Sequence, residues 1–332
     1  MAPAPEVSVV DLAALFESAL VLASLGNLPS GAPITQASLQ SGQIEALDGR
    51  LTYERLTTIF CGRRPDLALQ WLLDVGLLAH LLPELVATAA LADEGQGRHK
   101  DVWEHTKIVV RQAVARPALR WAAVLHDIGK VTTRHFVSSS KVTFIGHAEA
   151  GATMFREGPA RRMAFPAEIA ERVERLIFHH LRPAQYDASW SDAAVRRFVR
   201  DMGPDLVDVL DLSRADVTSQ RPGQRRQCLR RISELARRVR RIKAELKADR
   251  ERPALPSGLG EALMAEFSLS PGRAIGALKR RLALRVESGD LAVDSDLDLP
   301  AGGRGAPSIE ACLREVRRLS MLDDLELDLK AT

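Results

Sequence analysis

Apolar residues recur at intervals of three and four along most of the chain, which is the spacing of one helix face. The clearest examples are LALQWLLDVGLLAHLL (67–82), HTKIVVRQAV (105–114), ALRWAAVLHD (118–127), IAERVERLIFHH (169–180) and AAVRRFVRDMGPDLVDVLDLSRADV (193–217). Strand-like segments are rare and short, and VTFIG (142–146) is the best of them. The pattern predicts an all-α, mostly helical protein.

Proline and glycine clusters interrupt this pattern, and they mark its joints. They are RPA after Leu181, RPG from Arg221, and RPALPSGLG before Glu261. We place boundaries near residues 97, 222 and 252. The chain then divides into a helical neck-like region over 1–97, a central domain over 98–222, and a basic helix with a C-terminal helical body and tail over 223–332.

The composition is that of a folded globular protein. Apolar residues make up 46% of the 332 residues and charged residues make up 27%. No stretch resembles a membrane span, and the apolar run over 12–25 contains Glu17 and has no basic region before it, so we expect a cytoplasmic protein with no membrane partner. Aromatic residues make up only 5%, which argues against a stacking platform for bases.

The net charge of +3 is small, but the basic residues are unevenly distributed. No Lys or Arg precedes Arg50, whereas the segment Arg221–Arg252 carries basic residues on most faces of an expected long helix. One interpretation is a solvated helix that packs its apolar residues on the core. The expected inward-facing residues are Leu229, Ile232, Leu235, Val239, Ile242 and Leu246. The other interpretation is a surface for RNA or nucleotide phosphates, to which arginine is well suited.

The candidate chemistry centres on an adjacent His126–Asp127 pair at the end of the apolar stretch 118–127. Two polar side chains at the end of a buried-looking helix are costly unless something compensates for their desolvation, and a metal ion would do so. Lys130 follows closely, and it is either a phosphate contact or a cation that opposes a helix dipole.

Further metal-ligand residue types follow in order along the chain. His105 lies twenty-one residues before His126, a distance that allows two antiparallel helices to bring the imidazoles together. The others are His147, the doublet His179–His180, and Asp216. Imidazoles and carboxylates bind divalent transition metals, and such ions can activate water for attack on phosphorus. The sequence therefore predicts a metal site.

The order of His105, His126–Asp127 and Asp216 resembles the H…HD…D signature of the HD superfamily of metal-dependent phosphohydrolases. That resemblance implies a helical HD-domain bundle over 98–222 with these four residues as ligands. His147 and His179–His180 resemble the extra histidines of members that hold two or more metals, although His179 or His180 could instead be a supporting or core residue. We expect one or two divalent ions, either Mn, Ni, Mg, Fe or Co, with Asp127, Lys130 and His147 in catalytic roles.

A narrower resemblance covers about Leu51 to Leu291. LDVGLLAHLLPEL, RHKDVWEHT, RWAAVLHDIGK, VTFIGHAEAGA, AAVRRFVRDMGP and LSRADVTS look like the C-terminal half of bacterial CCA tRNA nucleotidyltransferases. In that family a glycine-rich turn and a strand-borne DxD pair form the transferase domain, and we find neither ahead of the helical region. The first fifty residues are degenerate as a neck, since no arginine precedes Arg50. We therefore expect a stand-alone relative that does not add CCA.

These observations are consistent with two alternative functions. The first is a divalent-metal phosphohydrolase that acts on a phosphomonoester, a 2′,3′-cyclic phosphate or a nucleotide. The alternative is a tRNA- or RNA-binding module that uses the segment Arg221–Arg252 and works with a separate nucleotidyltransferase chain. The oligomeric state is left open.

Overall fold

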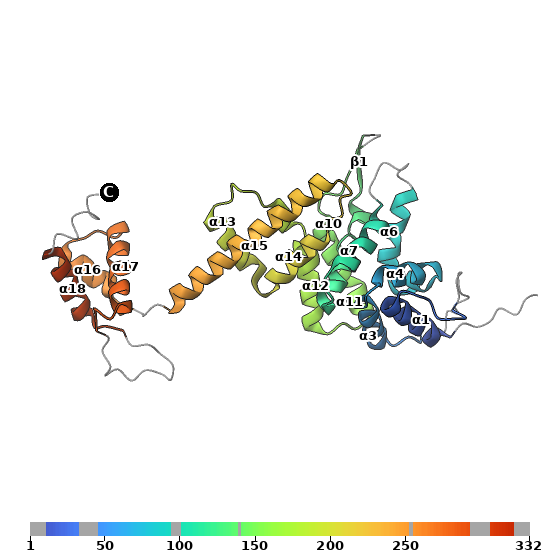
Figure 1. Ribbon diagram of the computed structural model, residues 1–332, viewed down its shortest axis with the longest axis horizontal. Coiled ribbons are helices and arrows are strands. Elements are labelled where there is room, and N and C mark those ends of the chain that lie inside the picture. Colours follow the sequence, from blue (N-terminus) through green and yellow to red (C-terminus); the bar gives the residue numbers. More distant parts are fainter. Residues whose placement is uncertain are drawn as a thin grey trace, which may run out of the picture. The chain divides into compact units, whose positions relative to one another are not determined.

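The computed structural model describes residues 11–32, 46–93, 101–138, 141–251, 255–292 and 306–321 (Figure 1). The all-α prediction is confirmed, because these residues are mainly helical and their strands are limited to one short hairpin. The chain forms two compact units, Met1–Arg240 and Arg241–Thr332. The expected boundaries near 97 and 252 lie outside the described residues.

The first unit contains most of the elements. They are α1 (Leu12–Leu25), α3 (Gly49–Phe60), α4 (Pro65–Asp74), α5 (Leu77–Leu81), α6 (Pro83–Asp93), α7 (Val102–Gln112), α8 (Pro117–Leu125), α9 (Lys130–Thr133), β1 (His135–Ser138), β2 (Lys141–Thr143), α10 (His147–Glu157), α11 (Pro159–Arg162), α12 (Ala167–His179), η1 (Arg182–Gln185), α13 (Asp192–Met202), η2 (Gly203–Asp205) and α14 (Leu206–Ala215). The long helix α15 (Pro222–Glu251) begins in this unit and continues into the second.

Helix α8 is the centre of the first unit. Every residue of α8 after Pro117 is buried, and the proline starts the helix at a position where no backbone donor is needed. Helices α3, α7, α12 and α14 pack against α8, and Figure 1 shows α7, α12 and α14 close together. On one side of α8 the Trp121 ring contacts the rings of Phe60 and Phe165, with centroid distances of 4.8 Å in both cases. This packing fixes the end of α8, where the His126–Asp127 pair lies.

A buried ion-pair network also joins α12 and α14 to the start of α8. The Asp208 carboxylate on α14 lies 2.7 Å from the Arg116 guanidinium before α8 and 2.6 Å from Arg172 on α12. Asp205 pairs with two arginines of α12, Arg172 at 3.2 Å and Arg175 at 2.5 Å. Both carboxylates are 3% exposed, so their charges depend on these arginines. The network fixes helices that carry residues of the predicted metal site.

The strand prediction over 142–146 is only partly right. Strand β2 ends at Thr143, and it pairs antiparallel with β1 so that Phe136 lies opposite Val142. The chain then turns, because the Phe144 carbonyl accepts a hydrogen bond from the His147 backbone N–H at 3.2 Å. Gly146 has a φ of 81°, a conformation that glycine adopts without strain, and the turn leads directly into α10.

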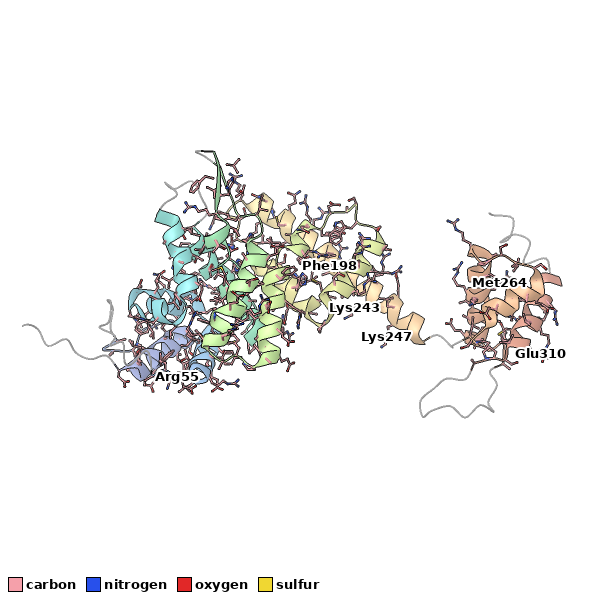
Figure 2. All side chains as sticks on the ribbon, turned by 180° about the vertical axis from the view of Figure 1, so that it is seen from behind. Arg55, Phe198, Lys243, Lys247, Met264 and Glu310 are labelled. Atoms are coloured by element: carbon pink, nitrogen blue, oxygen red, sulfur yellow. The ribbon has the colours of Figure 1, made fainter. Side chains whose placement is uncertain are left out.

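Helix α15 packs its apolar face as predicted at four positions, since Ile232, Leu235, Val239 and Ile242 are buried. Leu229 is half-buried. The expectation for Leu246 is wrong, because its exposed fraction is 39%. Lys243 and Lys247 mark this C-terminal half of the helix in Figure 2, where both side chains are exposed.

The second unit has its own apolar core, formed between α16 (Leu259–Phe267), α17 (Arg273–Glu287) and α18 (Ile309–Met321). Its fully buried members include Leu263, Leu282 and Cys312, and Met264, labelled in Figure 2, packs against them. Among the described helices of the whole chain, none combines the length and apolarity that crossing a bilayer requires.

Candidate metal centre

Residues of the predicted site lie where several helices end. His126 is the C-terminal cap of α8, and Asp127 follows it. His147 is the first residue of α10, His180 caps the end of α12, and Asp216 caps the end of α14. Only His105 lies within a helix, in the part of α7 that follows its Asp101 cap. Residues separated by more than a hundred positions are thereby brought together.

The first group consists of His105, His126 and Asp216, each offering one ligand atom within 4.8 Å of the others. The His105 and His126 Nε2 atoms are 3.2 Å apart. The Asp216 Oδ1 atom lies 2.9 Å from the His105 Nε2 atom and 3.8 Å from the His126 Nε2 atom. These distances are compatible with three ligands around one small ion.

The second group consists of Asp127, His147 and His180, again with ligand atoms within 4.8 Å of one another. The His147 and His180 Nε2 atoms are 3.2 Å apart, and the Asp127 Oδ1 atom lies 3.5 Å from the His147 Nε2 atom. The other oxygen of Asp127 faces the first group, at 3.2 Å from the His126 Nε2 atom. Asp127 therefore lies between the two groups, with one carboxylate oxygen toward each.

Backbone carbonyls fix the tautomer of three of the four imidazoles. The Nδ1 atoms of His126, His147 and His180 lie 3.0, 2.8 and 2.6 Å from the carbonyls of Ala123, Phe144 and Ile177. Each Nδ1–H donates to its carbonyl, which leaves the Nε2 lone pair directed into the site. The fourth imidazole, His105, contacts the Thr218 hydroxyl through Nδ1 at 2.9 Å.

In the second group, burial disfavours a protonated imidazole, so protonation does not readily relieve the repulsion between the facing lone pairs. Desolvation lowers the pKa of His147, and it lowers the pKa of His180 to about 4. Desolvation also lowers the pKa of His105. Burial alone would raise the pKa of Asp127, but the charges of His126 and Lys130 hold it well below its usual range. Burial would lower the pKa of His126, but the charge of Asp127 beside it raises that pKa. Neutral imidazoles beside an ionised carboxylate, as in the second group, are the donor set that a divalent cation requires.

Three side chains of the site are partly exposed, and we call them its open edge. Side-chain exposure is 27% for Asp216, 19% for Lys130 and 11% for His147, whereas His105, His126 and Asp127 are almost fully buried. The Lys130 Nζ atom lies 2.6 Å from the Asp127 Oδ2 atom, so its ammonium stands at this open edge. Lys130 and one residue of each group are therefore accessible to solvent.

The structure does not bring His179 into either group of the described residues. Its ring packs edge-on against Phe178, and its Nδ1 atom is buried without a hydrogen-bond partner among the residues that the structure describes. His135 lies on β1 and is exposed. Sequence reasoning did not single out two residues that support the site, Phe144 and Thr218. The only available signal was their position beside His147 and Asp216 in VTFIGH and ADVTS.

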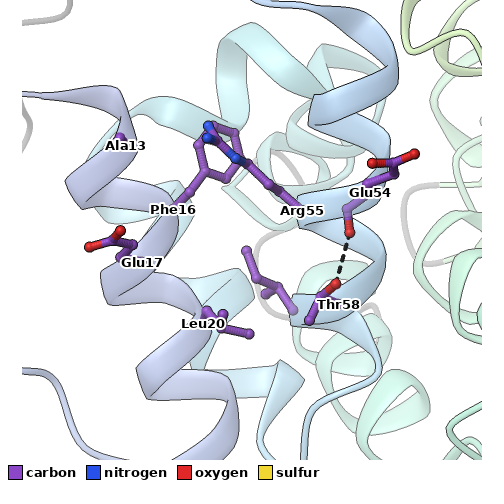
Figure 3. Close-up of a pocket in the computed structure, with 8 residues that line it drawn as sticks. Ala13, Phe16, Glu17, Leu20, Glu54, Arg55 and Thr58 are labelled. Atoms are coloured by element: carbon purple, nitrogen blue, oxygen red, sulfur yellow. Dashed lines mark hydrogen bonds between the residues drawn. The ribbon is translucent and has the colours of Figure 1, made fainter.

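A separate groove of about 260 Å³ lies between α1 and α3 (Figure 3). Its apolar floor includes Phe16, Leu20 and Ile59, and Arg55 lies over the Phe16 ring at 5.1 Å. None of the residues that line this groove belongs to the two His–Asp groups. The groove is therefore not part of the metal centre.

Comparison with known proteins agrees with this geometry. The family model described as "HD domain" matches residues 84–221, which include every residue of both groups. The chain is 33% identical over 256 residues to the CC-adding tRNA nucleotidyltransferase of Thermus thermophilus, which covers 73% of this chain and 54% of that protein.

Two further relatives are of the same kind. The A-adding tRNA nucleotidyltransferase of Deinococcus radiodurans is 33% identical over 67% of this chain and 51% of its own length. The Multifunctional CCA protein of an Azoarcus species is 31% identical over 32% of this chain and 26% of its own length. The chain thus spans about half the length of the first two relatives. Residues 84–221 thus match the HD domain family, and the chain is similar to about half of the length of a CC-adding and an A-adding tRNA nucleotidyltransferase.

Proposed function

We propose that this protein is a divalent-metal-dependent phosphohydrolase whose centre holds two ions, one in each His–Asp group. The observation that carries this proposal is the pair of facing Nε2 atoms in each group, 3.2 Å apart. In the second group, where burial lowers the pKa of both histidines, the facing lone pairs repel at this distance, and a cation between them removes the repulsion. Packing alone gives no reason to direct four imidazoles and two carboxylates at common points.

The donor set fits the proposed ions. His105, His126 and Asp216 would hold one ion, and His147, His180 and Asp127 would hold the other. Mixed imidazole and carboxylate donors suit Mn, Fe, Co or Ni, and Asp127 offers an oxygen to each group. When bound, such ions would supply the Lewis acidity that activates water and stabilises charge on phosphorus.

The surrounding residues bind and orient the substrate in this proposal. The Lys130 ammonium at the open edge neutralises a phosphoryl oxygen. The carbonyls of Ala123, Phe144 and Ile177 keep a proton on Nδ1 of their histidines, so the Nε2 atoms stay available as ligands. The buried positions of His126 and Asp127 keep bulk water away from the inner side of the site.

The proposal is tested by assaying the metal-loaded chain on phosphomonoesters, 2′,3′-cyclic phosphates and nucleotides. We expect hydrolysis of at least one class with Mn or Ni, and its loss when a chelator removes the metal. Hydrolysis that persists unchanged after complete metal removal would contradict the proposal, as would inactivity of metal-loaded protein on every class.

Replacing Lys130 by Met is expected to lower kcat/KM by about tenfold to a hundredfold, because one charge-assisted contact to phosphate is lost. Metal content should stay within a factor of about two of the parent, since Lys130 is not a ligand. Steady-state kinetics with metal analysis checks this. The matched control is Lys107→Met, whose ammonium pairs with Glu104 on α7 and lies outside both groups. Equal kcat/KM for Lys130→Met and the parent would remove Lys130 from the site.

A second candidate function, RNA binding, is favoured by one side of α15. Arg226, Arg230, Arg237 and Arg240 fall within about 80° of one another at about 100° per residue. All four are exposed, and they have no ion-pair partner among the described residues. Arg238 differs, because it pairs with Asp192 at 2.6 Å. Free guanidinium groups in a stripe can contact successive phosphates.

Replacing these four arginines by glutamine is expected to weaken RNA binding and to reduce the slope of log K against log salt by about three to four. Filter binding of tRNA over a salt series measures both quantities. The control removes the same charge elsewhere, at the exposed residues Arg197, Arg200, Arg273 and Arg280. A slope that falls equally in both variants would show that the α15 stripe has no special role.

A further inference from the structure

The hairpin β1–β2 lies between Lys130 and His147 in the chain, so both of its ends connect to the metal centre. Strand β1 extends away from the helices in Figure 1. Phe136 on this strand is 59% exposed, although phenylalanine side chains are normally buried. Phe144, directly after β2, is half-buried. An exposed aromatic side chain beside a polar site is a candidate ligand contact.

Contacts of Lys130 lead from the site to the end of this hairpin. The Lys130 Nζ atom lies 2.6 Å from the Asp127 carboxylate and 5.6 Å from the centroid of the Phe144 ring. Farther out, the Arg134 guanidinium lies 4.7 Å from the centroid of the Phe136 ring. The register pairs Phe136 with Val142 across the hairpin, and Phe144 follows directly after the end of β2. Two aromatic rings, each with a cation beside it, therefore lie on the segment that joins Lys130 to His147.

We propose that Phe136 and Phe144 hold the nucleobase of a substrate whose phosphate lies between Lys130 and the two His–Asp groups. This assigns the substrate class as nucleotide phosphoesters, and it rests on the proposed phosphohydrolase function. The aromatic rings match the flat face of a base, and Lys130 matches the phosphate charge. The low aromatic content excludes an extended platform, but two of the nine phenylalanines suffice for a single base.

The test measures binding rather than turnover. Calorimetry on the manganese-loaded full chain compares adenosine 5′-monophosphorothioate, a slowly hydrolysed nucleotide analogue, with ribose 5-phosphate, which has no base. We expect the nucleotide analogue to bind about tenfold or more tightly, as stacking on an aromatic side chain provides. In the double variant Phe136→Leu, Phe144→Leu, that preference should fall to about twofold, because affinity for the nucleotide analogue falls much more than affinity for ribose 5-phosphate. A preference that survives the double variant would overturn the proposal.

Leucine keeps the apolar volume at both positions, so loss of the ring face is separated from loss of packing. The Phe144 carbonyl that fixes His147 belongs to the backbone and remains. Val137→Ala is the matched control, because Val137 is exposed on β1 next to Phe136 and has no aromatic ring. It should leave the preference intact. A comparable loss in Val137→Ala would show that the preference does not depend on the rings.

A second arm identifies the source of the base. A short oligoribonucleotide ending in a 3′-phosphate is compared with the mononucleotide. If the substrate is an RNA end, it binds more tightly and remains equally sensitive to the leucine substitutions. If Phe136 instead mediates association of two copies of the chain, light scattering would show a dimer that the double variant dissolves, and the proposal would be wrong.

Failure of this proposal is distinguishable from failure of the proposed function. Ribose 5-phosphate and other base-free phosphoesters test hydrolysis without the hairpin. If they are hydrolysed while the base adds no affinity, only the nucleobase assignment fails. If the base adds affinity but no phosphoester of any class is hydrolysed, the phosphohydrolase function fails and the hairpin remains a nucleotide-binding element.

Discussion

Replacement of Asp127 by Ala is expected to lower phosphoester hydrolysis by at least about a thousandfold, the largest effect of any single substitution in the site. Asp127 directs one oxygen toward His126 at 3.2 Å and the other toward His147 at 3.5 Å. Its loss removes a ligand from one group and a neighbouring negative charge from the other. Several kilocalories per mole of transition-state stabilisation depend on the metals, which corresponds to this change in rate.

Activity measured beside metal content and thermal unfolding distinguishes this effect from misfolding. The Asp127→Asn variant keeps the volume of the side chain and one oxygen, and we expect it to fold while it still loses most activity. Asp201→Asn on α13 is the control, because Asp201 lies outside both groups and its ion pair with Arg182 is partly exposed. Activity in Asp127→Ala within tenfold of the parent would refute the role of this carboxylate.

Replacement of Gly129 by Ala is expected to destabilise the first unit by about 3 kcal/mol or more and to displace His147. A Cβ atom at position 129 would lie 2.1 Å from the His147 carbonyl oxygen and 2.5 Å from the Gly151 backbone nitrogen. Both are backbone atoms at the start of α10, so no side-chain rotation relieves the clash, and overpacking of a close backbone contact is costly. The midpoint of thermal unfolding should fall by about 6–12 °C.

Because the first turns of α10 must move, the second His–Asp group should lose metal affinity in any Gly129→Ala protein that folds. Calorimetry and metal titration measure the two effects separately. Gly223→Ala is the matched control, since a Cβ atom there meets nothing within 4 Å. If Gly129→Ala unfolds within 1 °C of the parent and binds metal normally, the close contact between α9 and α10 is not required.

The helical spacing of apolar residues predicted the fold class, because α7, α12 and α14 each bury one side and α8 is buried on all sides. The hairpin was harder to predict from VTFIG, since its end depends on the φ of Gly146 and on the turn made by the Phe144 carbonyl. The exposure of Leu246 was not predictable in the same way, because the spacing of apolar residues does not show where along α15 the packing ends.

The order of histidines and aspartates along the chain named the residues of both groups, but it assigned Asp127 only to the set of His105, His126 and Asp216, whereas Asp127 also lies beside His147 and His180. The direction of each Asp127 oxygen depends on side-chain torsion and on helix packing, which no sequence spacing encodes. The doublet His179–His180 could not be separated for the same reason. His180 caps α12 and turns its Nε2 atom inward because its Nδ1 atom donates to the Ile177 carbonyl.

The arginine–aspartate network was absent from the sequence predictions. Asp205 and Asp208 follow the pattern of an ordinary polar helix start, and Arg116 lies far from them in the chain. Only the packing of α12 and α14 beside the start of α8 brings these charges into one buried network. Its contribution is to hold the helix ends that carry His126, His180 and Asp216.

The central claim, that the two His–Asp groups bind a pair of divalent ions, is tested most directly by counting ions. Protein dialysed against Mn at neutral pH should retain about two ions per chain in mass-spectrometric metal analysis, one for each group. The His180→Ala variant should retain about one, because His180 belongs only to the second group. Wild-type protein that folds normally and retains no ion under these conditions would contradict the account.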